Sequence, residues 1–284
     1  MPSRPRTARH RTVRHPRRPR LILATASLAV AALGLLAAAP VASAQSTVNY
    51  VALGDSYSSG VGAGNYTSSS GSCDQSTSAY PVLWANASAP ASFVNETCSG
   101  ATTSSVISSQ LGALNSGTSL VSITVGGNDV GFSSVMETCV LESTSSCVSA
   151  VDNAESEIAS QLPGELNNVL GDIKSDAPNA RVVVLDYPQL YDLSKSSSCI
   201  GLSTTDRTDL NQGASELDSA IQAAAGRYGD VFADVQGQFA GHQICDSSSW
   251  LHSVNFLDID ESYHPTASGQ ADGYLPVFTA AAEG

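Results

Sequence analysis

The sequence predicts an α/β domain in which a parallel β-sheet carries helices on both faces. Short apolar runs of strand length alternate along the chain with longer segments whose apolar residues recur every three or four positions, as in an amphipathic helix. Strands and helices that alternate in this way form βαβ units, and the strands of such units are parallel. Because no internal repeat and no long linker divides the chain, we expect a single domain.

The chain contains five predicted strands and five predicted helices. The strands are Val48–Leu53, Ser92–Asn95, Leu120–Val125, Arg181–Asp186 and Asp230–Ala233. The helices are Tyr80–Ala87, Thr103–Leu111, Val148–Lys174, Leu210–Arg227 and Thr266–Ala282. Pro163 is expected to kink or split the third helix, because proline lacks the N–H that a helix interior needs. Pro265 stands at the first turn of the last helix, where proline is favoured.

The first 44 residues have the pattern of a secretory signal peptide. Eight arginines precede an apolar stretch from Leu21 to Ala39, and Ala42-Ser43-Ala44 follows in the small-x-small pattern of a signal peptidase site. A membrane anchor is the alternative, because the apolar stretch is nearly long enough to span a bilayer. The Ala-x-Ala ending favours cleavage after Ala44. We therefore expect a secreted, extracellular protein of residues 45–284, while the pair Arg17-Arg18 leaves the export route open.

The part of the chain after Ala44 is strongly acidic. It holds five basic and 26 acidic side chains, a net charge of −21, against −13 for the whole chain. Such a charge keeps a protein soluble and disfavours nucleic acid as a partner. It also disfavours electrostatic docking to anionic membranes. We expect a monomer that binds a small-molecule or lipid substrate and has no stable membrane anchor.

The cysteines indicate disulfide bonds rather than a metal site. An even number in an exported chain predicts three disulfides among Cys73, Cys98, Cys139, Cys147, Cys199 and Cys245. About 15 pairings are possible for six cysteines. Pairing each cysteine with its sequence neighbour closes the shortest loops, and we favour that pattern. No Cys-x-x-Cys pair occurs and only three histidines follow Ala44, so we expect no metal.

Ser56 is the candidate nucleophile. It follows the first predicted strand in the segment Gly54-Asp55-Ser56, at the strand end where open α/β sheets gather their ligands. A serine in that place can attack a substrate if a base and oxyanion donors lie nearby. The alternative is an ordinary strand-to-helix turn in which Asp55 caps the helix.

Two further strand ends carry candidate oxyanion donors. Gly126-Gly127-Asn128 follows the third strand, and the side-chain amide of Asn128 can donate to a developing negative charge. Gly100 follows the second strand and can present its backbone N–H to the same charge. Simple turns, with Asn128 as a helix cap, are the alternatives.

His264 is the candidate general base. It lies between Glu261 and the last predicted helix, and Glu261 can fold back to bind one ring nitrogen while the other faces Ser56. A surface histidine beside an acidic loop is the alternative. His242 and His252 lack this context, so we expect structural or exposed roles for them.

The ordered segments Gly-Asp-Ser, Gly, Gly-x-Asn-Asp and His-Pro together resemble the SGNH hydrolase superfamily, the GDSL esterases and lipases. The resemblance covers the chain from Ser56 to His264 and is closest to secreted bacterial GDSL lipases with three disulfides. No Gly-x-Ser-x-Gly segment occurs, which disfavours the common α/β-hydrolase arrangement. The resemblance implies a flavodoxin-like three-layer α/β/α sandwich with a central parallel sheet of about five strands.

The resemblance also implies the roles of the site residues. Ser56 would be the nucleophile and His264 the base, and the oxyanion hole would consist of the Ser56 N–H, the Gly100 N–H and the Asn128 side chain. Family members place aspartate three residues before the histidine, where this chain has Glu261. We expect Glu261 to orient the ring. Asp260, or a backbone carbonyl near Ser262 in a Ser–His dyad, is the alternative.

The sequence therefore predicts a secreted serine ester hydrolase, a lipase or carboxylesterase, that cleaves acyl esters of lipids without a cofactor. A polysaccharide O-acetylesterase or a phospholipase with the same site is an alternative. A secreted carbohydrate-binding module is disfavoured, because only Trp84 and Trp250 are available as large aromatic platforms. A catalytically inactive scaffold is disfavoured because all four segments are present.

Overall fold

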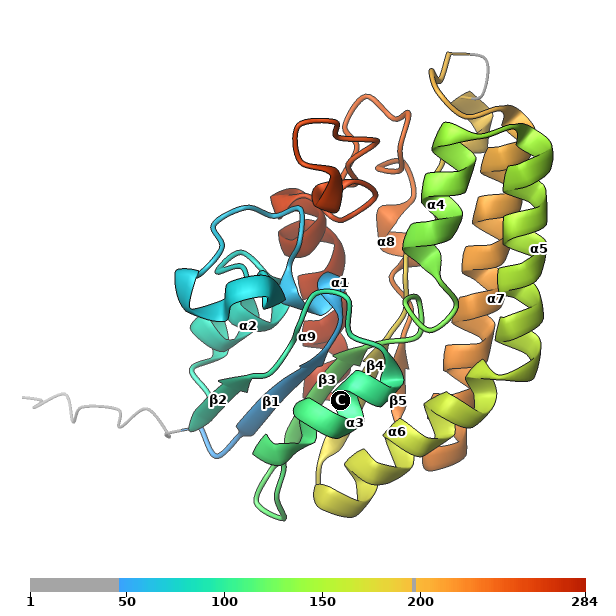
Figure 1. Ribbon diagram of the computed structural model, residues 1–284. Coiled ribbons are helices and arrows are strands. Elements are labelled where there is room, and N and C mark those ends of the chain that lie inside the picture. Colours follow the sequence, from blue (N-terminus) through green and yellow to red (C-terminus); the bar gives the residue numbers. More distant parts are fainter. Residues whose placement is uncertain (1–45, 196–197) are drawn as a thin grey trace, which may run out of the picture. The chain divides into compact units, whose positions relative to one another are not determined.

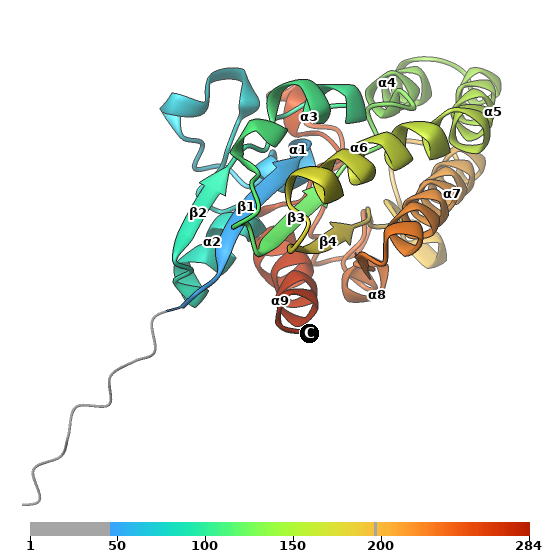
Figure 2. The same ribbon diagram turned by 90° about the horizontal axis from the view of Figure 1, so that it is seen from below.

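The computed structural model describes residues 46–195 and 198–284, so the predicted signal peptide of residues 1–44 lies outside the described residues. The described part contains a five-stranded sheet with the order β2-β1-β3-β4-β5. Every neighbouring pair of strands is parallel. Helices cover both faces of this sheet (Figures 1 and 2). The predicted three-layer α/β/α fold is confirmed, and the strand order is that of flavodoxin-like folds.

The strands lie close to their predicted positions. They are β1 (Asn49–Gly54), β2 (Ser92–Asn95), β3 (Leu120–Thr124), β4 (Arg181–Leu185) and β5 (Val231–Ala233). The chain moves from β1 outward to β2 and then crosses back to β3 on the other side of β1. This reversal opens a crevice at the carboxyl ends of β1 and β3, the usual place for a ligand in such sheets.

The helices match the predicted ones in part. They are α1 (Ser56–Ser59), α2 (Tyr80–Ser88), α3 (Thr103–Ser109), α4 (Phe132–Leu141), α5 (Thr144–Ser160), α6 (Leu162–Asp176), α7 (Thr204–Tyr228), α8 (Gln236–Phe239) and α9 (Leu275–Glu283). The long predicted helix is split into α5 and α6, with Pro163 in the first turn of α6. The last predicted helix begins with a π-helical segment, Gly269–Tyr274, before α9.

The hydrophobic core lies on both faces of the sheet. The α3 and α6 helices pack on one face and α2 and α9 on the other (Figure 2). The strands β1, β3 and β4 are buried along almost their whole length, as expected for a parallel sheet covered on both sides. Near β5, α7 packs against α5 and α6, and α4 packs against α5. Across the described residues, no helix is long and apolar enough to cross a bilayer.

The disulfides connect neighbouring cysteines. The pairs are Cys73–Cys98, Cys139–Cys147 and Cys199–Cys245, so the favoured pairing is confirmed. The first pair holds the segment after β2, which carries Gly100, and the second joins α4 to α5. All six cysteines lie outside the strands, so each bond joins segments that flank the sheet.

Candidate active site

The structure brings Ser56 and His264 into direct contact. Ser56 is the first residue of α1 and follows β1, and its side chain is 7% exposed. The Oγ atom of Ser56 lies 2.7 Å from Nε2 of His264. The side chain of Asp55 caps α1 by accepting the N–H of Tyr57 at 3.0 Å. The cap places Ser56 at the amino end of a helix. His264 lies in the loop before the last helical segment.

A backbone carbonyl, not a carboxylate, holds the other ring nitrogen. The Nδ1 atom of His264 lies 3.0 Å from the carbonyl oxygen of Ser262, to which it donates in the tautomer that leaves Nε2 free to accept. The expectation that Glu261 orients the ring is wrong. Its carboxylate accepts the Tyr66 hydroxyl at 2.7 Å and contacts the Asn255 side-chain amide at 3.5 Å. Glu261 ends a short 3₁₀ turn, Ile259–Glu261, and its side chain is held by these two partners rather than by the ring.

The protonation state of His264 suits a general base. Burial lowers the pKa of His264 to about 4, and the carbonyl oxygen of Ser262 opposes this effect by accepting a hydrogen bond from the ring. The neighbouring His252 lowers the pKa a little further. At neutral pH the imidazole is therefore uncharged and can accept a proton from Ser56.

The backbone at the predicted oxyanion hole has free donors. Among the hydrogen bonds of the described residues, none uses the N–H of Ser56 or of Gly100. Gly100 has a φ of 74°, a left-handed conformation that favours glycine. Asn128 donates to the carbonyl oxygen of Ala101 at 3.0 Å, which ties the segment after β3 to the segment that holds Gly100. The amide of Asn128 has a second hydrogen, which this bond does not use.

A buried network that the sequence did not predict supports these strand ends. Asp55 accepts hydrogen bonds from the Thr124 hydroxyl at 2.7 Å and from the Tyr187 hydroxyl. The Tyr187 hydroxyl also accepts the N–H of Gly127 at 3.3 Å. Burial raises the pKa of Asp55 to about 6, against the opposing effect of its three donors. One feature of the sequence could have indicated Tyr187. It lies two residues after the end of β4, as Ser56 lies two residues after the end of β1.

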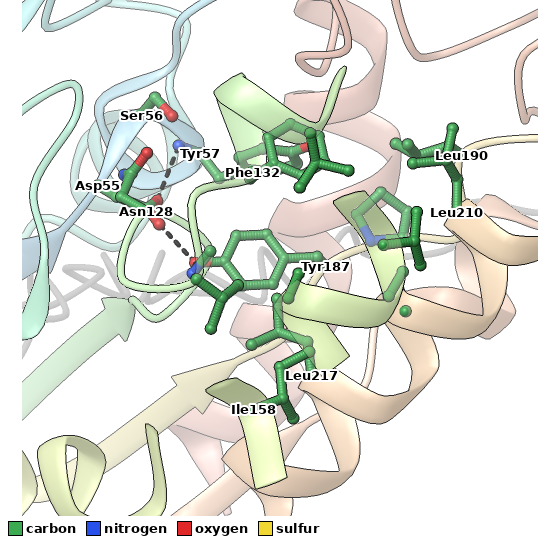
Figure 3. Close-up of a pocket in the computed structure, with 18 residues that line it drawn as sticks. Asp55, Ser56, Tyr57, Asn128, Phe132, Ile158, Tyr187, Leu190, Leu210 and Leu217 are labelled. Atoms are coloured by element: carbon green, nitrogen blue, oxygen red, sulfur yellow. Dashed lines mark hydrogen bonds between the residues drawn. The ribbon is translucent and has the colours of Figure 1, made fainter. Parts of the chain in front are cut away.

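An apolar pocket opens beside Ser56. Ser56, Asn128 and Tyr187 line one side of it, and residues of α4, α5, α7 and the segment after β4 line the rest (Figure 3). The apolar lining includes Phe132, Val151, Ile158, Leu190, Leu210 and Leu217. The pocket thus extends from the candidate nucleophile between α5 and α7, and its chemistry suits a hydrocarbon chain.

The two other histidines of the described part stand apart from Ser56. His252 donates from Nε2 to the carbonyl oxygen of Gly62 at 2.8 Å, and its backbone N–H donates to the carbonyl oxygen of His264 at 3.0 Å. His242 stacks on Trp250, with ring centroids 3.7 Å apart. Both have structural contacts, as expected.

Comparisons with known proteins show which proteins this chain is similar to. Residues 52–271 match the GDSL-like lipase/acylhydrolase family. Lipase 1 of Streptomyces coelicolor is 52% identical over 269 residues, which cover 94% of this chain and all of that protein. A lipase of Streptomyces rimosus is 47% identical over 92% of this chain and 98% of that protein.

Two solved structures are also similar. The crystal structure of phospholipase A1 from Streptomyces albidoflavus NA297 has a TM-score of 0.81 and 51% identity, covering 83% of this chain and 99% of that one. The crystal structure of an extracellular lipase from Streptomyces rimosus has a TM-score of 0.80 and 49% identity, covering 82% of this chain and 99% of that one.

Proposed function

The chain belongs to the GDSL-like lipase/acylhydrolase family and is a carboxylic ester hydrolase, and from this premise we propose that it cleaves acyl esters of lipids through an acyl-enzyme on Ser56. The observation that carries the proposal is the 2.7 Å contact between Ser56 Oγ and His264 Nε2 beside an apolar pocket. A nucleophile paired with a base supports acyl transfer, and the pocket supports an acyl chain as the group transferred.

The reaction follows from the two partners of His264. Nε2 takes the Ser56 proton as Oγ attacks the ester carbonyl, while the Ser262 carbonyl oxygen holds the ring through Nδ1. His264 then gives this proton to the departing alcohol. A water molecule attacks the acyl-enzyme with the same histidine as base, which releases the acid and restores Ser56. The site then works as a Ser–His dyad and needs no cofactor.

The negative charge of the tetrahedral intermediate requires donors fixed in advance. We assign this role to the N–H groups of Ser56 and Gly100 and to the free amide hydrogen of Asn128. The support is that both N–H groups are unused among the described residues and that Asn128 lines the pocket together with Ser56. Fixed donors of this kind often contribute the largest part of the rate enhancement.

We also propose that residues 1–44 are removed on export and that residues 45–284 act outside the cell as a monomer. Three disulfides support an oxidising compartment. A relative that is 49% identical is described as an extracellular lipase.

A phospholipid ester is the second candidate substrate, because a 51% identical structure is that of a phospholipase A1. An O-acetylated polysaccharide fits the site less well, since the pocket beside Ser56 is lined mainly by apolar side chains.

Hydrolysis of p-nitrophenyl esters from acetyl to palmitoyl tests the proposal. We expect activity to increase toward longer chains and to disappear in Ser56→Ala. Ser59→Ala is the matched control, because the Ser59 hydroxyl contacts the carbonyl oxygen of Ser56 rather than His264. Activity limited to the acetyl ester would contradict lipid hydrolysis, and an active Ser56→Ala protein would contradict the nucleophile.

A further inference from the structure

The loop between His252 and Tyr263 exposes three large apolar side chains. We call residues 253–262 the display loop. Phe256 is 80% exposed, Leu257 100% and Ile259 62%. Single exposed apolar side chains are ordinary on protein surfaces, but three within four residues form a patch of the kind that marks an interaction site.

The loop is held in this shape by its own hydrogen bonds. The side-chain oxygen of Asn255 accepts the N–H of Leu257 at 3.1 Å and that of Asp258 at 3.3 Å. The N–H of Asn255 donates to the hydroxyl oxygen of Ser262 at 2.8 Å. Because these bonds fix the backbone between Asn255 and Ser262, the apolar side chains at the tip are held outward.

The base of the display loop is joined to the candidate active site. The N–H of His252 donates to the carbonyl oxygen of His264 at 3.0 Å, and the N–H of Tyr263 donates to that of His252 at 3.1 Å. The bond from Tyr66 to Glu261 ties the loop to the segment after α1. The loop therefore lies at the end of the sheet toward which the strand arrows point, the end that carries Ser56 (Figure 1).

The charges on the loop favour one kind of lipid surface. Asp258 and Asp260 are exposed on the loop itself, and no lysine or arginine follows Arg227 in the sequence. Carboxylates repel an anionic membrane, whereas the outermost group of phosphatidylcholine is a cationic ammonium. Apolar tips flanked by carboxylates are complementary to a zwitterionic lipid surface.

We propose that the display loop docks the enzyme on a zwitterionic lipid–water interface, with Phe256 and Leu257 inserted among the lipids. This rests on the proposed function, since an enzyme that takes lipid esters must draw them from an aggregate. The base of the loop is bonded to the backbone of His264, which contacts Ser56. Docking through this loop therefore brings the candidate active site toward the lipid surface.

Vesicle binding without turnover tests the inference. Ser56→Ala protein is mixed with phosphatidylcholine vesicles, and the bound fraction is measured by flotation. Adding Phe256→Ser and Leu257→Ser should lower the partition coefficient by about tenfold or more, since burying one such side chain is worth roughly that factor. Adding Val94→Ser, which removes an exposed apolar side chain from β2, should leave it unchanged.

Several results would overturn the inference. These are a parent protein that does not bind the vesicles, equal binding by the loop variant, or stronger binding to vesicles that contain phosphatidylglycerol. A parent dimer that the loop variant converts to a monomer in sedimentation would show that a second copy of the chain covers the loop.

Two controls separate the loop from the catalytic site. With Ser56 restored, Phe256→Ser/Leu257→Ser should hydrolyse soluble p-nitrophenyl acetate within about twofold of the parent, which confirms an intact site. If Ser56→Ala failed to abolish ester hydrolysis, the proposed function would fall. The vesicle measurement, which involves no turnover, would still report on the loop.

Discussion

The two ring nitrogens of His264 have partners of different chemistry: the Ser56 hydroxyl at Nε2 and the Ser262 carbonyl oxygen at Nδ1. A carbonyl dipole can fix the tautomer and the angle of the ring, as a carboxylate does. It carries no net charge, however, so it stabilises the imidazolium less. The carboxylate of Glu261 does not contact the ring. It accepts the Tyr66 hydroxyl instead and so stabilises the loop.

Substitutions at Glu261 and His264 distinguish these roles. We expect Glu261→Gln to keep kcat within about threefold, because glutamine can still accept the Tyr66 hydroxyl, and His264→Ala to lower it by about 10³-fold. Steady-state kinetics on p-nitrophenyl butyrate measure both, with Asp260→Asn as the matched loop control. Equal losses of kcat would mean that Glu261 acts on the ring.

The acid limb of the pH profile reports on the burial of His264. Its pKa is lowered to about 4 from an ordinary value of 6.5, so the ring stays neutral, and competent as a base, well below pH 6. We expect kcat/KM for a soluble ester to fall as the pH decreases through about 4, since this ratio reports the free enzyme. Circular dichroism at each pH separates protonation from unfolding. A midpoint near the ordinary value would contradict the lowered pKa of His264.

At the scale of elements, the proposed function assigns the acyl chain to the pocket lined by α5 and α7. Ala214 on α7 lines the pocket, so Ala214→Phe should fill part of it. We expect kcat/KM for palmitoyl esters to fall by at least about tenfold while acetyl esters change by less than about threefold. Ala223→Phe, at an exposed position of the same helix, is the matched control. Equal losses on both esters would show that the acyl chain binds elsewhere.

Element boundaries show what periodicity predicts and what it misses. The strands β1, β3, β4 and β5 were predictable because each is mainly a short apolar run. The break between α5 and α6 was predictable because Pro163 is incompatible with a continuous helix. The α4 helix was missed: it follows Gly131, has no side-chain cap, and runs into a serine-rich turn. Its stability comes from packing on α5 and from the Cys139–Cys147 bond, which are tertiary contacts.

The same limit applies to the site. The contact between Ser56 and His264 was predictable because each residue stands at a strand or helix end in a recognisable segment. The oxyanion roles of Gly100 and Asn128 stay predictions. The role of the Ser262 carbonyl was only one of three alternatives, since every residue has a carbonyl and no side chain marks it. Tyr187 was missed because its partner, Asp55, comes from a distant strand, and only the sheet order places them together.

At the scale of the whole molecule, two buried carboxylates link stability to pH. Asp186 is 1% exposed and Asp218 5%. Asp186 accepts the N–H of Val235 at 2.8 Å, and Asp218 accepts that of Tyr187 at 3.1 Å. Burial raises the pKa of both carboxyls well above the usual range, and mutual repulsion raises the pKa of Asp186 further. The folded protein therefore keeps protons that the unfolded chain has released.

This difference predicts lower stability at alkaline pH. Because the folded state binds more protons above the unfolded pKa, the free energy of unfolding decreases as the pH rises through the folded pKa values. We expect Tm to be lower at pH 9 than at pH 6, and Asp186→Asn to reduce that difference. Calorimetry at both pH values, with exposed Asp172→Asn as control, measures it. A variant with the parent's pH dependence would contradict the assignment.

The Ser262 carbonyl also bears on how such a site can evolve. A mutation at position 262 removes the hydroxyl that accepts the Asn255 N–H, but it leaves the backbone carbonyl to which the ring donates. The feature that must be kept is instead the path of the backbone around His264. This path leaves room only for glycine at position 62, which is remote in the sequence but close in space. A Cβ at Gly62 would lie 2.7 Å from the carbonyl oxygen of Pro265 and 3.0 Å from the Cβ of His264. Among natural variants, we therefore expect more change in residue type at 262 than at 62.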